Sequence, residues 1–338
     1  MNAALAAGAL QPPDVTTHER DLLRCCLLPP AEAVLAWQNL TGQGDPEIPA
    51  SLQPLLGLLG ERVTPAGIRP AEPLAGRLRA AQVIEQQRNE ALREIAAHIA
   101  GLPALAALRP LIVGGLASAM LAWPQPMLRH TSRIALLLPS ARAAIDAARI
   151  LTSGSEFTIE RGGRWTGSAL RLSHRSGMPL LLHGGYCAAP AWGMDHARLA
   201  SRAVPGRVME HDVVLGDRQS CLALAALDGL KKREEGASLL WLADAVFLLR
   251  QLGENERALY LPPAVILPLI RRAAEIDPAL QLQNDAVSPD EVVGAIAALH
   301  GMPAALAPMR AARRLFWFCR LAPRAIAGGV RDRLRPRF

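Results

Sequence analysis

The chain has 338 residues, of which 51% are hydrophobic and 20% charged, so it can form two or three packed domains. This composition excludes a disordered chain, and five cysteines without metal-ligand spacing argue against a disulfide scaffold. The formal net charge of +7 comes almost entirely from arginine, since Lys231 and Lys232 are the only lysines. Arginine binds anions in a bidentate manner, but a GC-rich genome would give the same bias, and we favour that simpler cause.

The N-terminal residues MNAALAAGALQPPD have no basic start and too short an apolar run for a signal peptide. Together with cysteines that fit reduced thiols, this predicts a cytoplasmic protein. The uncharged stretch 111–128 approaches the length of a membrane span. It contains Gly114, Gly115, Pro124 and Pro126, which favour a buried strand followed by a helix.

The first predicted region, residues 1–108, is helical. A helix with a threonine cap is expected over 14–26, and the Pro- and Gly-rich stretch 41–77 predicts loops around one or two short helices. A long amphipathic helix follows over 71–99, with charged residues such as Glu85 outside its apolar seam. Such a seam is typical of a face that packs against the rest of the protein.

The second predicted region, residues 109–215, mixes short strands with helices. Strands are predicted at 111–113, 134–138, 157–159, 169–172 and 180–182, with a helix at 140–151. The third region, 216–338, is helical again, with segments at 219–231, 237–251, 262–275 and 289–300 before a basic tail. The predicted class is therefore α+β, with a small mixed-sheet core between two helical regions.

The pattern that bears chemistry begins at the first strand of this core. The strand ends at the glycine pair Gly114-Gly115, and Ser118 lies one helical turn later. Arg129 and Ser132 then precede the second strand, which opens with the triplet Arg133-Ile134-Ala135. A glycine turn before a helix lets the backbone approach a phosphate group and offers it free N–H groups.

This layout resembles the core of the polymerase-β-like nucleotidyltransferase superfamily, in particular its large uncharacterised bacterial family. The resemblance implies a nucleotidyltransferase-like fold, in which the glycine turn precedes a strand carrying an Asp-x-Asp pair. Two acids separated by one residue point to the same side of a strand and can hold a divalent metal. A third acid of the family lies on a later strand, two residues before a histidine.

At the matching positions this chain carries no acid. Arg133 and Ala135 stand in place of the Asp-x-Asp pair, and Leu181 stands in place of the third acid. The histidine of the later strand is retained as His183, and Trp241 to Asp244 resembles the helical Trp-x-x-Asp segment of the family. The chain is thus expected to be a pseudoenzyme, with no catalytic residue and no metal site.

Arg133 can replace the missing cation and hold a phosphate directly; the alternative is a surface or salt-bridged arginine without a ligand. The predicted nucleotide or anion site comprises Gly114, Gly115, Ser118, Arg129, Ser132, Arg133 and His183. No resident cofactor is predicted, and a nucleotide or phosphate is the candidate ligand. The resemblance further implies an accessory role with a protein or peptide partner, in peptide-modification or polysaccharide gene clusters.

Two alternatives stay open. In the first, the chain is an active magnesium-dependent transferase whose acids come from Asp146, Glu156, Glu160 or Asp195, and at least two of these must then converge on the glycine turn. In the second, the basic tail from Arg310 onward, with its interleaved aromatic residues, contacts an anionic membrane, nucleic acid or an acidic protein. For the tail itself we favour a terminal helix that docks its aromatic residues into the helical region. The polar clusters 195–196 and 210–212 are expected to have loop or capping roles.

Overall fold

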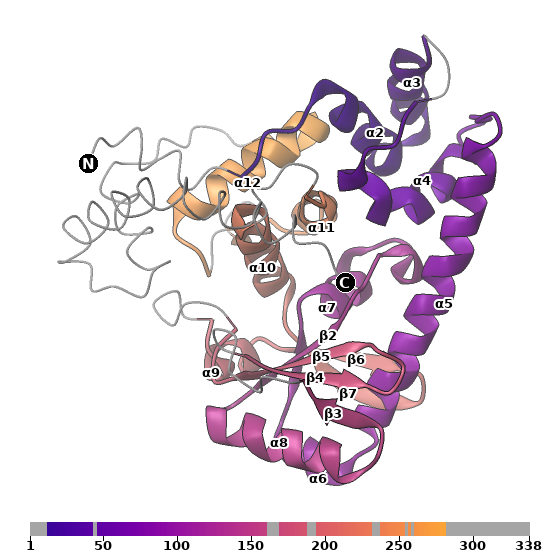
Figure 1. Ribbon diagram of the computed structural model, residues 1–338. Coiled ribbons are helices and arrows are strands. Elements are labelled where there is room, and N and C mark those ends of the chain that lie inside the picture. The colour runs from indigo at the N-terminus through magenta and orange to yellow at the C-terminus, as the bar shows by residue number, and fades with distance from the viewer. Residues whose placement is uncertain are drawn as a thin grey trace, which may run out of the picture.

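A computed structural model describes residues 12–42, 46–160, 169–187, 194–231, 237–253, 256–257 and 260–281. Its centre is a seven-stranded sheet with the strand order β3-β4-β5-β2-β1-β7-β6 (Figure 1). The strands are β1 (Leu111–Val113), β2 (Ile134–Leu138), β3 (Phe157–Ile159), β4 (Ala169–His174), β5 (Pro179–Gly184), β6 (Val204–Val208) and β7 (His211–Leu215). The predicted segment 289–300 and the basic tail lie outside the described residues.

The sheet is mixed. β1 runs antiparallel to β2 and parallel to β7, β2 runs parallel to β5, and the hairpins β3-β4, β4-β5 and β6-β7 are antiparallel. The central strand β2 is buried along its whole length, because both of its sides are covered. Strand periodicity alone would bury one side, with Ile134, Leu136 and Leu138, but Ala135 and Leu137 are buried as well.

Helices surround the sheet. The N-terminal helices are α2 (Thr17–Leu27), α3 (Pro30–Thr41), α4 (Leu56–Val63), α5 (Leu74–Ala100) and α6 (Pro103–Ala106), with a 3-10 turn at Ala50–Leu55. The later helices are α7 (Gly115–Ala122), α8 (Ala141–Ser153), α9 (His196–Ala200), α10 (Arg218–Lys231), α11 (Leu240–Leu249) and α12 (Pro263–Ile276). In Figure 1, α6 and α8 lie below the sheet, α7, α10 and α11 lie above it, and α5 runs down one side.

The predicted α+β class is confirmed: helices precede, flank and follow a mixed sheet. The threonine cap is Thr16, whose side chain accepts a hydrogen bond from the Glu19 N–H while Glu19 reaches back to the N–H of Thr16. The long helix α5 begins at Leu74, three residues after its predicted start, because Pro73 occupies the cap position. Each of the five predicted strands is present.

One hairpin had not been predicted as strands. Residues 204–208 form β6 and residues 211–215 form β7, so that only Glu210 of the cluster 210–212 lies in the turn between them. Pro205 and Gly206 made β6 hard to recognise as a strand in the sequence, since both residues are rare in the interior of a sheet. The structure places β6 at the sheet edge, where a proline need not donate a hydrogen bond to a further strand.

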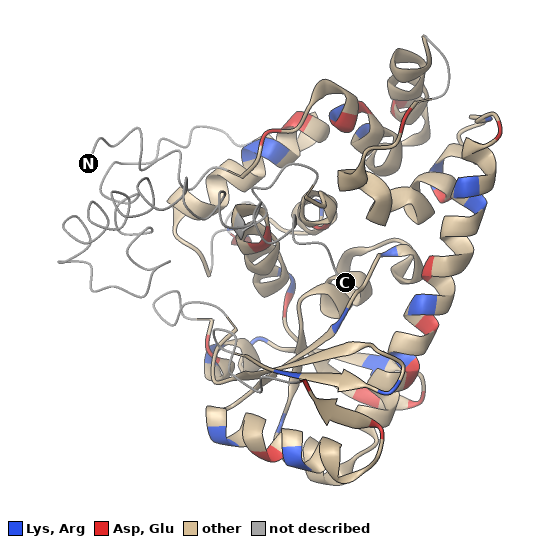
Figure 2. Ribbon diagram, in the orientation of Figure 1, with Lys and Arg blue, Asp and Glu red and all other residues tan. Residues whose placement is uncertain are grey.

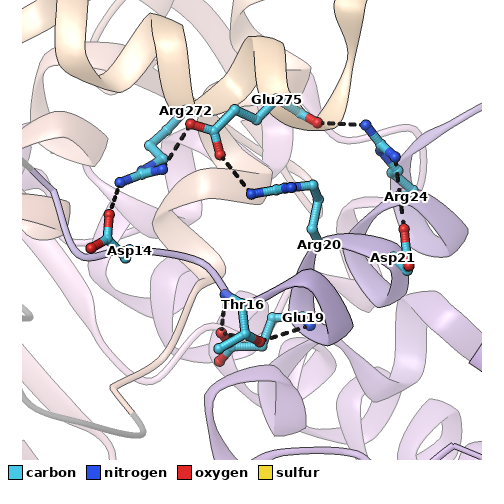
Figure 3. Close-up of polar contacts among 8 residues, drawn as sticks. All are labelled: Asp14, Thr16, Glu19, Arg20, Asp21, Arg24, Arg272 and Glu275. Atoms are coloured by element: carbon cyan, nitrogen blue, oxygen red, sulfur yellow. Dashed lines mark hydrogen bonds and ion pairs between the residues drawn. The ribbon is translucent and has the colours of Figure 1, made fainter.

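Ion pairs join the two ends of the described chain. Figure 3 shows α2 beside α12, with Glu275 accepting from Arg20 at 3.3 Å and from Arg272 at 2.7 Å. Arg272 also pairs with Asp14, and Arg24 donates to the Glu275 carbonyl at 2.9 Å. The helices before and after the sheet therefore pack against each other.

Charged side chains avoid the helix at the centre of this packing. Figure 2 shows blue and red bands along α5 and α8, whereas α11 carries a single acid, Asp244, and is buried throughout. None of the helices in the described part of the chain combines the length and the apolar character that crossing a bilayer requires.

Candidate functional site

The glycine turn links β1 to α7. Gly114 has φ +70° and ψ −139°, a backbone conformation that side chains with a Cβ rarely adopt. Gly115 follows at the first position of α7, and a Cβ added there would collide with the guanidinium of Arg129. Both glycines are therefore required by the fold itself, one for its backbone angles and the other for the close approach of an arginine.

The turn lies beside the three positions where the resemblance implies acids. Val113, the residue before the turn, pairs with Ala135 on β2, and Ala135 pairs on its other side with Leu181 on β5. Arg133 directly precedes β2 and shares a side of the strand with Ala135, because side chains alternate along a strand. The glycine turn, Arg133, Ala135 and Leu181 thus lie next to one another in the sheet.

Arg133 and Ser132 are exposed. Within the described ranges, the Arg133 guanidinium makes no hydrogen bond or ion pair, unlike most arginines around the sheet. Ala135 is only 8% exposed, whereas Leu181 is half-buried. Among the described residues, the site therefore presents the unpaired Arg133 beside the apolar Ala135 and Leu181, and Leu181 is flanked on its other side by Arg171 of β4, which pairs with Glu160.

Arg129 lies behind the turn and is only 7% exposed. Its Nε donates to one Asp244 oxygen at 2.8 Å and its Nη2 to the other at 2.6 Å, while Nη1 donates to the His130 carbonyl and the Thr131 hydroxyl. Burial opposes the charged form of Arg129, but the Asp244 carboxylate outweighs that effect and raises its pKa. The nitrogens of Arg129 are thus engaged inside the protein rather than directed to a ligand.

Asp244 also accepts a hydrogen bond from Trp123 Nε1 at 2.7 Å. The Asp of the helical Trp-x-x-Asp segment on α11 therefore fixes both the end of α7 and the loop that precedes β2. Trp241, the first residue of that segment, packs against Gly229 on α10, where a Cβ would lie 2.8 Å from the indole ring. In this chain the segment serves packing between the sheet and the C-terminal helices.

Two residues of α5 position the same loop and were missed by the sequence analysis. Asn89 is 2% exposed, and its side-chain nitrogen lies 2.8 Å from the Met127 carbonyl and 2.9 Å from the Arg129 carbonyl. Glu85, expected on the outer side of the helix, is 7% exposed and lies 2.9 Å from His130 Nδ1. Gly57 of α4 allows this burial, since a Cβ there would lie 3.3 Å from the Glu85 side chain.

Ser118 and His183 are the remaining predicted anion-site residues. Ser118 is 3% exposed and hydrogen-bonds to the thiol of Cys221 on α10. Burial raises the pKa of that thiol to about 12, although the Ser118 hydrogen bond acts in the opposite direction. His183 lies opposite Leu137 of β2 and is half-buried, two residues after Leu181. Of the seven predicted residues, Ser132 and Arg133 are exposed, the glycine pair and His183 are partly buried, and Ser118 and Arg129 are buried.

The alternative carboxylates do not converge on the turn, and each has another role. Asp146 pairs with Arg142 and Arg149 on α8, Glu156 with His98 and Arg175, Glu160 with Arg171 of β4, and Asp195 caps α9. Across the described ranges, no group of three or more His, Cys, Asp or Glu residues is arranged to hold a metal ion.

The polar pair Asp195-His196 has the capping and loop roles that were expected. Asp195 accepts a hydrogen bond from the Arg198 N–H at the start of α9, and His196 is buried with its Nε2 2.8 Å from the Arg109 carbonyl.

Comparison of the chain with protein-family models, with curated proteins and with solved structures finds no match. A function must therefore be argued from the site alone.

Proposed function

We propose that this chain is a nucleotidyltransferase-like protein that has lost its metal-binding acids and acts as an accessory protein. The observation that carries the proposal is the strand register, in which Val113, Ala135 and Leu181 lie side by side next to Gly114. Three separate sequence matches thereby meet at one place, as the resemblance requires of a glycine turn and its acids.

The same place favours a bound anion over a bound metal. A guanidinium at Arg133 repels a divalent cation, and the methyl and isobutyl groups of Ala135 and Leu181 offer no oxygen ligand. Arg133 is exposed and unpaired within the described chain, and the free N–H groups at the start of α7 lie beyond Val113. We infer that a phosphate group of a nucleotide, or phosphate itself, binds between Arg133, Ser132 and the glycine turn.

The proposed role is that of a cytoplasmic accessory protein with a protein or peptide partner. Four cysteines lie in the described residues, and all four are free and buried, which suits a reducing compartment. A scaffold without catalytic groups can still bind a ligand and present it, or change its own surface, for a partner.

The experiment is a titration of the full chain with ATP, CTP, GTP and UTP by isothermal calorimetry, with and without magnesium. We expect saturable binding of at least one nucleotide that does not require the metal. Arg133→Ala should weaken it about tenfold or more, because a charge-assisted hydrogen bond to phosphate is lost. Arg142→Ala is the matched control, since Arg142 is an exposed arginine on α8 at the far side of the sheet.

Two results would contradict the proposal. The first is metal-dependent transfer of a nucleotide to any protein, peptide or small acceptor. That result would support the alternative of an active transferase whose metal-binding acids lie at other positions. The second is an affinity for nucleotides that is equal in wild type, Arg133→Ala and Arg142→Ala, which would leave Arg133 as a surface arginine without a ligand.

A further inference from the structure

A cavity of about 620 Å³ lies on the opposite side of β2 from Arg133 and Ala135. It opens to solvent and is lined by the end of α5, by α6 and α9, and by the strands β1, β2 and β7. In Figure 1 the lower end of α5 reaches the sheet near α6. Its walls are largely apolar and include Ile99, Ile112, Ile134, Leu136, Ala197 and Val214.

The size and lining match those of small-molecule sites, which are concave, mostly apolar and about 300–1,000 Å³ in volume. A void of this size loses the contacts that a packed interior would make. The residues around it are nevertheless held firmly, because Ile112 and Ile134 belong to the paired strands β1 and β2. The cavity is therefore a preformed space on rigid elements.

Its polar wall is built around Arg109. The backbone of Arg109 is left-handed, with φ 52°, and its carbonyl lies 2.8 Å from Nε2 of the buried His196. Such a conformation costs energy in a residue other than glycine and is often found at binding sites. The contact joins the loop before β1 to α9 at the wall of the cavity, so the imidazole and the Arg109 backbone are held in place.

The charges at the wall favour an anion. Asp212 of β7 is the only acid among the described residues that line the cavity, and it lies directly opposite Arg207 of β6 in the hairpin register, although the two side chains form no ion pair. Opposite charges at facing positions of a hairpin attract each other. Arg109 faces no acid across a strand pair, and its exposed side chain makes no hydrogen bond or ion pair within the described ranges. The guanidinium of Arg109 is thus available to a ligand at the wall of the cavity.

We propose that this cavity binds a small apolar organic acid, with its hydrocarbon or aromatic body against Ile112, Ile134 and Leu136 and its acidic group at Arg109. This site is separate from the one beside the glycine turn, because neighbouring side chains of β2 point to opposite sides of the sheet. Binding here therefore does not depend on the nucleotidyltransferase resemblance.

The probe is anilinonaphthalene sulfonate, an aromatic acid that fluoresces on entering an apolar site, added to the full chain. We expect saturable binding that octanoate displaces about tenfold more strongly than octan-1-ol, because only the acid pairs with a guanidinium. Ala200→Phe, which places a ring into the cavity from α9, should abolish binding. Ala80→Phe on the exposed face of α5 is the matched control and should bind as wild type does.

Arg109→Gln tests the acidic group separately. This variant should bind octanoate and octan-1-ol equally, since the cavity is kept and the charge is lost. Circular dichroism checks that each variant is folded, and Ala197→Phe replaces Ala200→Phe if the latter is not. Absence of saturable binding, wild-type affinity in both cavity-filling variants, or a preference for octanoate that survives Arg109→Gln would each overturn the proposal.

Discussion

Arg129 and Asp244 lie 115 positions apart in the sequence and form a buried bidentate ion pair. The pair connects the loop before β2 to α11, and the arginine also occupies the space where Gly115 would carry a Cβ. The family resemblance suggested Arg129 as an anion-binding residue and Asp244 as part of a separate helical segment. In the structure the two side chains bind each other. In this chain that contact stabilises the position of the sheet against the C-terminal helices.

Removing Asp244 should strongly destabilise the protein. Asp244→Ala leaves a buried guanidinium and the Trp123 N–H without an acceptor, which is expected to lower the free energy of unfolding by about 3–5 kcal/mol. Urea denaturation of the full chain measures the effect. Asp146→Ala, which removes exposed ion pairs on α8, should cost only about 0.5 kcal/mol. An equal loss of unfolding free energy in the two variants would show that the buried pair stabilises the protein no more than an exposed pair does.

Gly115→Ala should also be destabilising, by about 1–3 kcal/mol, because the new methyl group displaces the Arg129 guanidinium from Asp244. Gly154→Ala at the end of α8 is the matched control. Its Cβ would meet nothing within 4 Å and its φ is negative, so it should be neutral or slightly stabilising. Thermal unfolding compares the two. A Gly115→Ala variant as stable as Gly154→Ala would mean that the arginine moves aside at no cost.

Alkaline pH should weaken the fold through Cys221. Burial raises the pKa of this thiol from 9.0 to about 12, so the folded state keeps its proton where the unfolded chain loses it. The thiol therefore has no effect on stability below about pH 9. From there to about pH 12 it lowers the free energy of unfolding by up to about 1.4 kcal/mol per pH unit.

Urea denaturation at several pH values from 8 to 10.5 tests this contribution. Burial also raises the pKa of Cys25 to about 12, so wild type loses stability from more than one thiol. Cys221→Ala should lose stability less steeply with rising pH than wild type, and the two should run parallel below pH 9. If the unfolding free energy falls equally steeply with pH above 9 in wild type and Cys221→Ala, Cys221 does not cause the loss of stability.

The ion pairs between α2 and α12 should contribute modestly and in a salt-dependent way. Glu275→Gln removes the pairs with Arg20 and Arg272, whose side chains are 31% and 18% exposed, and should cost about 0.5–1 kcal/mol at low salt. Glu72→Gln, which breaks a pair exposed on both sides, should have no measurable effect. Urea denaturation at 0.02 and 1 M NaCl should show the Glu275 effect shrinking with salt.

Hydrophobic periodicity was sufficient to predict most of the fold. The helix 71–99 and the strands 111–113 and 134–138 have clear apolar patterns, and local caps such as Thr16 fix where the helices begin. The hairpin of β6 and β7 was not predicted, because Pro205 and Gly206 break the strand pattern and are tolerated only in an edge strand.

The candidate site was predicted in part, for a reason that lies in tertiary contacts. The pairing of β2 with β5 spans α8, β3 and β4, so no local pattern predicts that Ala135 and Leu181 are neighbours, and only the family resemblance led us to expect it. The burial of Arg129 depends on Asp244, and that of Glu85 depends on the space left by Gly57 of α4. Contacts between residues so far apart leave no periodic signal in the sequence.

Placing acids at the three positions where the resemblance implies them should create a metal site. In the triple variant Arg133→Asp, Ala135→Asp, Leu181→Asp, two carboxylates share one side of β2 and the third faces them from β5. Such a set provides the oxygen ligands that magnesium and manganese prefer. Electron paramagnetic resonance of Mn²⁺ should show binding at least about tenfold tighter than in wild type.

The control for this variant is Arg77→Asp with Arg142→Asp, which lowers the net charge by the same amount at two separated, exposed sites. Because it gathers no set of acids, it should bind Mn²⁺ only as weakly as general electrostatic attraction allows. A folded triple variant that binds no better than this control would mean that the three side chains do not point to one centre. That result would contradict the correspondence between this sheet and a nucleotidyltransferase core, whereas binding confined to the triple variant would support it.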